Sequence, residues 1–252
     1  MAIQILNQTL SSKAAQLYEQ IQSQLSKPLN IRPISDLNSQ GARRYGALDF
    51  SHNDAYYVYL STDLHSEPFE VNMLHELHHI QQIEQGFPTV NSNNPERFNS
   101  QNKSYYQLIG AHLQSVVLDL DVWNWLTQRE MNIRFFTKNY IKEAKKYTNQ
   151  QISLSNRFAT AKYVCEMLLP FSHSTDLQRN TILKEAKFNL DALQHANRLS
   201  QQIKNIGYDT PIKAAHCMAL LLDEFNIWDT YCISYGNHAY RSSVKFHTQL
   251  GN

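Results

Sequence analysis

The chain has 252 residues, 42% of them hydrophobic, and carries 23 basic and 22 acidic residues. This hydrophobic content supports a folded core rather than disorder. The formal net charge of +1 gives no overall field to attract nucleic acid or an anionic membrane surface, so we expect neither partner. We find no apolar run long enough to span a bilayer and no signal-peptide pattern in the first residues, and we therefore expect a cytoplasmic protein.

The cysteine and glycine content favours a reduced, helical protein. Cys165, Cys217 and Cys232 form no Cys-x-x-Cys pair, and each lies in an apolar neighbourhood. We expect buried reduced thiols, and neither a disulfide framework nor a zinc ribbon. Glycine and proline are scarce, with seven of each, which favours helices over tight turns.

The N-terminal part of the chain predicts one helix and a small sheet. Residues 9–25 have the apolar spacing of an amphipathic helix. Three short runs follow, at 29–34, 45–50 and 56–60, separated by Asn, Ser, Gly and Asp, and each has the pattern of a strand. The simplest product is a small antiparallel sheet whose last strand leads within a few residues into the next helix.

That next helix contains the motif His75-Glu76-x-x-His79. A helix turns about 100° per residue, so two histidines four positions apart can aim their ring nitrogens at one point. Neutral imidazoles at roughly 2.0–2.1 Å are preferred zinc ligands, whereas Glu76 can reach a water and take its proton. The sequence therefore predicts a zinc site with a general base beside it.

The residues around the motif support a helix about five turns long. Ser66 is suited to cap it, Pro68 fits its first turn, and Gly86 is suited to end it. The apolar positions expected to bury one side of the helix are Phe69, Met73, Leu77, Ile80 and Ile83.

A helix, a short sheet whose last strand precedes a His-Glu-x-x-His helix, and a further helix with an acidic residue resemble the zincin zinc metallopeptidases, in particular their minimal bacterial relatives of the ImmA/IrrE type. The resemblance covers about the first half of the chain. It implies that His75 and His79 bind zinc, that Glu76 is general base and acid, and that a downstream carboxylate or histidine is the third ligand. It also implies that an extended peptide could pair with the strand around Tyr57–Tyr59.

The third ligand is expected on the helix predicted at residues 105–126, which is apolar on almost all sides. Acidic residues in a buried helix need a cation, a hydrogen bond or a metal. Asp119 and Asp121 point about 200° apart, so at most one of them faces the zinc. Asp119 ranks first, Asp121, His112 and Glu96 remain alternatives, and an aspartate departs from the glutamate that this family more often has.

The rest of the chain predicts helices without strands. The expected helices cover residues 134–147, 156–169, 177–206 and 211–225. This half could cover the cleft, bind a partner or form a homodimer. We therefore expect an α+β, mostly helical fold, with a zincin-like metal-binding core at 1–130 and an all-helical region at 131–252 that could pack into the same domain.

The resulting hypothesis is a zinc-dependent metallohydrolase of peptidase type that acts on a peptide or protein substrate, with Glu76 as general base. The alternative is a non-catalytic metal-binding protein whose helical half serves protein interaction or regulation. A protein side chain at the fourth coordination position would favour the alternative. Two histidines and an aspartate also suit manganese or iron.

Overall fold

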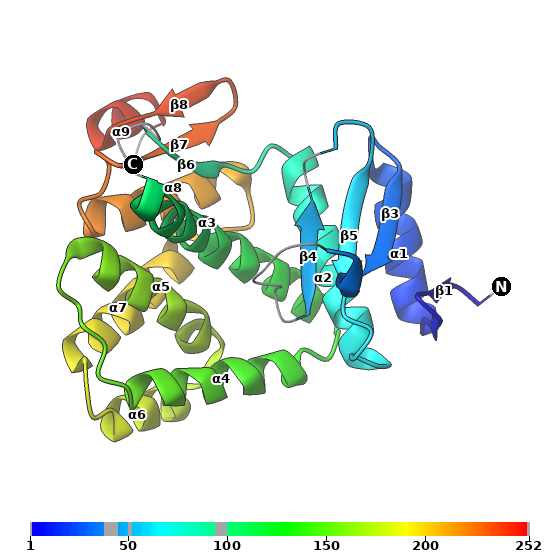
Figure 1. Cartoon of the computed structure of the whole chain (residues 1–252), viewed down its shortest axis with the longest axis horizontal. Coiled ribbons are helices and arrows are strands. Elements are labelled where there is room, and N and C mark those ends of the chain that lie inside the picture. Colours follow the sequence, from blue (N-terminus) through cyan, green and yellow to red (C-terminus); the bar gives the residue numbers. More distant parts are fainter. Residues whose placement is uncertain (1, 38–44, 50–51, 94–99, 251–252) are drawn as a thin grey trace. The chain divides into compact units, whose positions relative to one another are not determined.

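The structure is a computed structural model that describes residues 2–37, 45–49, 52–93 and 100–250 (Figure 1). The chain divides into two compact units. The first unit contains Met1–Gln85 and Val122–Phe136, and the second contains Gly86–Asp121 and Thr137–Asn252. The expected fold class, α+β and mostly helical, is confirmed.

The first unit begins with a short hairpin and a helix. Strands β1 (Gln4–Ile5) and β2 (Gln8–Thr9) pair antiparallel, and α1 follows at Ser12–Gln24. The N-cap residue Ser11 accepts from the backbone of the first turn, which satisfies one of the unpaired N–H groups there. Its own backbone N–H and hydroxyl donate to Glu70 at 2.6 and 2.8 Å. This carboxylate therefore ties the start of α1 to the motif helix.

Three strands of the first unit form a mixed sheet in the order β3-β5-β4. Strand β3 (Leu29–Pro33) pairs parallel with β5 (Tyr56–Leu60), and β4 (Gly46–Asp49) pairs antiparallel with the other side of β5. The expectation that Tyr57–Tyr59 could receive a substrate strand is wrong, because β5 is central and both of its sides are already paired. Phe50, at the end of the predicted second strand, lies outside the described residues.

The motif helix α2 spans Glu67–Glu84, as the sequence predicts. Ser66 is its N-cap residue but has φ 53°, and its side chain makes no capping bond among the described residues; its backbone N–H donates instead to Gln8 Oε1 at 3.1 Å. Ile83 is 44% exposed, contrary to expectation, because it lies in the last turn. The other predicted apolar positions are fully buried: Phe69, Met73, Leu77 and Ile80.

Helix α3 (Ser100–Gln128) belongs to both units. Its earlier turns place Ile109, Leu113 and Val117 in a hydrophobic core that lies within the second unit. The expected boundary between 130 and 131 is therefore wrong. Helix α3 up to Asp121 packs in the core of the second unit, and only its last turns belong to the first unit.

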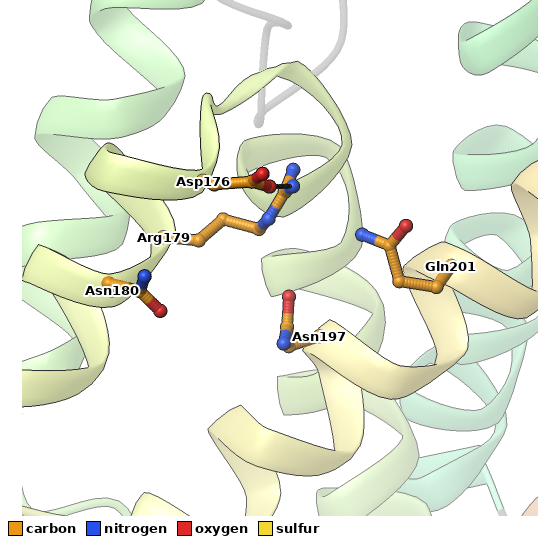
Figure 2. A pocket seen from close by; sticks show the side chains of 5 residues that line it. All are labelled: Asp176, Arg179, Asn180, Asn197 and Gln201. Carbon is orange, nitrogen blue, oxygen red and sulfur yellow. Dashed lines mark hydrogen bonds and ion pairs between the residues drawn. The ribbon is translucent and has the colours of Figure 1, made fainter.

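Helices supply most of the second unit, and the expected helix at 177–206 is two helices. Asn189 adopts φ 55° ahead of the second one, a left-handed conformation that separates the two. Figure 2 shows an ion pair between Asp176 and Arg179 near the start of the first. The helix bounds are Arg134–Thr148 for α4, Arg157–His173 for α5, Asp176–Glu185 for α6, Leu190–Ile206 for α7, Pro211–Glu224 for α8 and Ser243–Leu250 for α9. Within the described ranges, none of the helices has both the length and the apolar character needed to cross a bilayer.

The second unit also contains an antiparallel sheet that the sequence analysis missed. Strand β6 (Thr89–Ser92) pairs with β7 (Tyr231–Tyr235), which forms a hairpin with β8 (His238–Tyr240). The expectation that residues 131–252 are all helical is therefore wrong at this hairpin. The turn Gly236-Asn237 between two short alternating runs was the available signal.

Candidate metal centre

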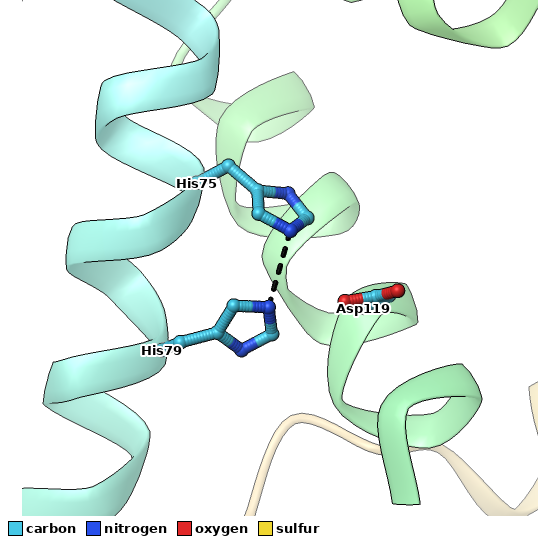
Figure 3. A group of neighbouring side chains, drawn as sticks. All are labelled: His75, His79 and Asp119. Atoms are coloured by element: carbon cyan, nitrogen blue, oxygen red, sulfur yellow. Dashed lines mark hydrogen bonds between the residues drawn. The ribbon is translucent and has the colours of Figure 1, made fainter. Parts of the chain in front are cut away.

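Helix α2 presents His75 and His79 on one face, one turn apart (Figure 3). Their Nε2 atoms lie 3.1 Å from each other, and their rings meet edge to face with centroids 4.7 Å apart. His75 is buried and His79 is partly buried. The spacing of the motif therefore brings two imidazole nitrogens to one point, as predicted.

Gln82 holds the outer nitrogen of one of these rings. The Nδ1 atom of His79 lies 2.8 Å from Gln82 Oε1, in a side chain that is fully buried. Because a carbonyl oxygen can only accept, the proton of neutral His79 is on Nδ1, and Nε2 carries the lone pair that faces His75. In metal sites, a hydrogen bond made by the ring nitrogen that does not bind the metal fixes the orientation of the imidazole. Sequence reasoning missed Gln82, although its position three residues after His79 places both on one helix face.

Asp119 of α3 completes the group. One ligand atom from each of His75, His79 and Asp119 lies within 4.8 Å of the others. The last turns of α3 explain this position, because Trp123, one turn after Asp119 on the same helix face, contacts the His75 ring at a centroid distance of 4.5 Å. Ser115, one turn before, donates its hydroxyl to Asp119 Oδ2 at 3.3 Å. The structure therefore brings together the three ligands that the sequence analysis ranked first.

Among the described residues, the alternative ligands Asp121 and His112 are not part of this group. The carboxylate of Asp121 contributes to raising the pKa of Tyr208, after the larger effect of burial, so it lies near that ring of the second unit. His112, two turns before Asp119, lines a neighbouring cavity. Glu96 lies outside the described residues. His78, the third histidine of the motif segment, stacks on Trp125 at 4.5 Å, which is a packing role.

Glu76 is buried, with 6% of its surface exposed, beneath strand β4. A Cβ atom added to Gly46 of β4 would lie 2.5 Å from Glu76 Oε1 and 2.9 Å from its Cγ. Only glycine therefore lets the strand backbone pass this close to the carboxylate. Glu76 Oε2 is buried without a hydrogen-bond partner among the described residues. A buried carboxylate oxygen in this state is costly unless a water or ion occupies the space beside it.

A small cavity within the second unit borders Asp119. Its volume is about 110 Å³, and α3, α4 and α5 supply its walls. His173, near Asp119, has a pKa lowered to about 4, chiefly by burial and then by the positive charge of Lys204, with Asp119 acting in the opposite direction. The lining residues are His112, Ser115, Val116, Asp119, Tyr140, Cys165, Glu166 and Leu169.

A comparison with protein-family models, with curated proteins and with solved structures found no match to this chain. The chemistry of the site itself is therefore what indicates a function.

Proposed function

We propose that this protein is a zinc-dependent hydrolase of peptidase type. The observation that carries the proposal is the meeting of ligand atoms from His75, His79 and Asp119 within 4.8 Å, with the buried carboxylate of Glu76 on the same helix. The resemblance to the zincins rests on the same motif. We propose a peptide or protein as the substrate.

The donor set suits zinc. Ligands at roughly 2.0–2.1 Å in a tetrahedral arrangement lie about 3.3 Å from one another, and the two imidazole Nε2 atoms are 3.1 Å apart. The carbonyl oxygen of Gln82 directs the lone pair of His79 into the site. Two nitrogens and one carboxylate oxygen are a ligand set that zinc uses in hydrolases.

The number of protein ligands distinguishes a catalytic zinc site from a structural one. Among the described residues, no fourth His, Cys, Asp or Glu joins the group of His75, His79 and Asp119. Structural zinc sites in proteins are closed by four protein ligands, whereas catalytic sites keep one position for water or substrate. A fourth protein ligand would favour the alternative of a non-catalytic metal-binding protein.

Each residue has a chemical role in this proposal. Zinc, when bound, lowers the pKa of a water and polarises a carbonyl group. Glu76 accepts a proton from the attacking water and donates it to the leaving amine. His75, His79 and Asp119 hold the ion, and the tight approach of Gly46 fixes the position of the Glu76 carboxylate. The outer edge of β4 has no strand partner among the described residues, so an extended peptide could pair there.

We also propose that the protein works in the cytoplasm. All three of its cysteines are buried and unpaired as thiols. Persistent free thiols are typical of reducing compartments, where disulfides are rare.

The test is elemental analysis of untagged protein together with a peptide-cleavage screen. We expect close to one zinc per chain in the wild type, loss of zinc in His79→Ala, and zinc without cleavage in Glu76→Gln, because this substitution keeps the shape of the side chain and removes the base. His238→Ala is the control, since this exposed histidine lies on β8. Wild type that binds no zinc refutes the proposal. Wild type that holds zinc and cleaves no peptide supports the non-catalytic alternative.

A further inference from the structure

A second cavity lies between α6 and α7, within the second unit (Figure 2). Its volume is about 350 Å³, within the range of small-molecule sites. It shares no residue with the candidate metal centre. All its lining residues in the described part of the chain are polar: Asp176, Arg179 and Asn180 from α6, and Asn197 and Gln201 from α7. A cavity of this composition suits a hydrophilic ligand.

The guanidinium of Arg179 is held in place before any ligand arrives. Its side chain is 13% exposed. Nη1 donates to the backbone oxygens of Phe171 and Ser174 at 3.1 and 2.6 Å, and Nη2 pairs with Asp176. These bonds use three of the five N–H donors of an arginine. Because the side chain is already ordered, a ligand that binds to it loses little additional entropy.

The charges around the cavity favour an anion. Lys204 lies one turn after Gln201 on α7, and its pKa is lowered, chiefly by burial and then by the positive charge of Arg179. Two cations are therefore close enough to repel each other. Asp176 pairs with Arg179 and also acts on Lys204, so one negative charge stands against two positive ones. An anion bound beside Arg179 and Lys204 would relieve this repulsion.

We infer that this cavity binds a small hydrophilic anion, a phosphate or carboxylate group carried on a hydroxylated carbon skeleton. Arg179 and Lys204 supply the positive charge. The side-chain amides of Asn180, Asn197 and Gln201 offer donors and acceptors for hydroxyl groups. The phosphate and carboxylate forms share this chemistry, and the choice of probes separates them.

The experiment is isothermal titration calorimetry of the full chain with glucose 6-phosphate, with gluconate, and with glucose as the uncharged control. The variant Lys204→Gln removes the cation that follows Gln201 by one turn on α7, next to the residues that line the cavity. The matched control Lys184→Gln removes another exposed lysine, from the last turn of α6. Gln201→Ala removes one amide without changing the charge.

We expect at least one of the two anions to bind, about tenfold more weakly in Lys204→Gln and with unchanged affinity in Lys184→Gln, because only Lys204 lies close enough to attract the bound anion. Gln201→Ala should weaken binding as well. The tighter of the two anions identifies the ligand as a phosphate or a carboxylate. The inference is overturned if neither anion binds, if glucose binds as tightly as the anions, or if both lysine variants lose affinity equally.

Discussion

Replacement of Gly46 by alanine tests the contact between strand β4 and the proposed general base. The new methyl would lie 2.5 Å from Glu76 Oε1, and an ordinary contact begins at 3.4 Å, so the two groups must separate by 0.9 Å. Glu76 is 6% exposed and has little space in which to move. Overpacking of this kind typically costs about 1–3 kcal/mol. We therefore expect Gly46→Ala to lower the free energy of unfolding by about this amount and to reduce peptide cleavage by displacing the carboxylate.

A double-mutant cycle isolates the cause of this loss. Urea unfolding is measured for wild type, Gly46→Ala, Glu76→Ala and the double variant. Glu76→Ala removes the three atoms nearest to the new methyl, Oε1, Cγ and Cδ of Glu76. In that background we expect Gly46→Ala to cost less than about 0.5 kcal/mol, since unrelated surface changes stay within this range. An equal cost in both backgrounds would refute the steric explanation and point to a general weakness of the strand.

Three further predictions concern other groups of the described structure. Gln82→Leu should weaken zinc binding about 10- to 100-fold in a chelator competition, as for other residues that orient a metal ligand. Gln81→Leu, the control on the same helix, should leave zinc affinity unchanged. Equal losses in the two variants would contradict the role given to Gln82. Because His173 is protonated near pH 6.5 in the unfolded chain but only near pH 4 in the folded one, acidification between these values should lower the free energy of unfolding by up to about 3 kcal/mol. His173→Phe should lose less stability than wild type when urea titrations at pH 7 and pH 4.5 are compared, and equal losses would contradict this. Burial raises the pKa of the Cys217 thiol to about 12 and also raises the pKa of the Cys165 thiol. Neither thiol should therefore react with a chromogenic thiol reagent at pH 8 until the chain is denatured. Rapid reaction of the native protein would show that these thiols are accessible.

The local parts of the candidate site could be predicted from the sequence. The four-residue spacing of His75 and His79 is a property of one helix, and so is the angle that separates Asp119 from Asp121. The number of residues between the motif and Asp119 does not predict that they lie close together. The apolar character of α3, however, limits the candidates for the third ligand to the few polar residues on this helix. Periodicity within single helices therefore accounts for most of what was found.

Contacts between distant segments could not be predicted in this way. Gly46 lies thirty residues before Glu76. A single glycine in a sequence does not predict which side chain will pack against its backbone. Strand β6 finds its partner β7 more than a hundred residues later in the chain. The central place of β5 depends on a parallel pairing with β3, which has no turn signal. Each of these features depends on which surfaces pack together, and a local pattern does not contain that information.

The continuity of α3 has a consequence for how the protein unfolds. Its backbone hydrogen bonds run without interruption from the second unit, which ends at Asp121, into the first, which resumes at Val122. A helix that broke there would leave up to four N–H and four C=O groups without partners. Melting of one unit would therefore leave the turns of α3 in the other unit with a new helix end whose backbone groups have no helical partner. We therefore expect the unfolding of the two units to be coupled through α3, and also through α4, which begins in the first unit and continues in the second.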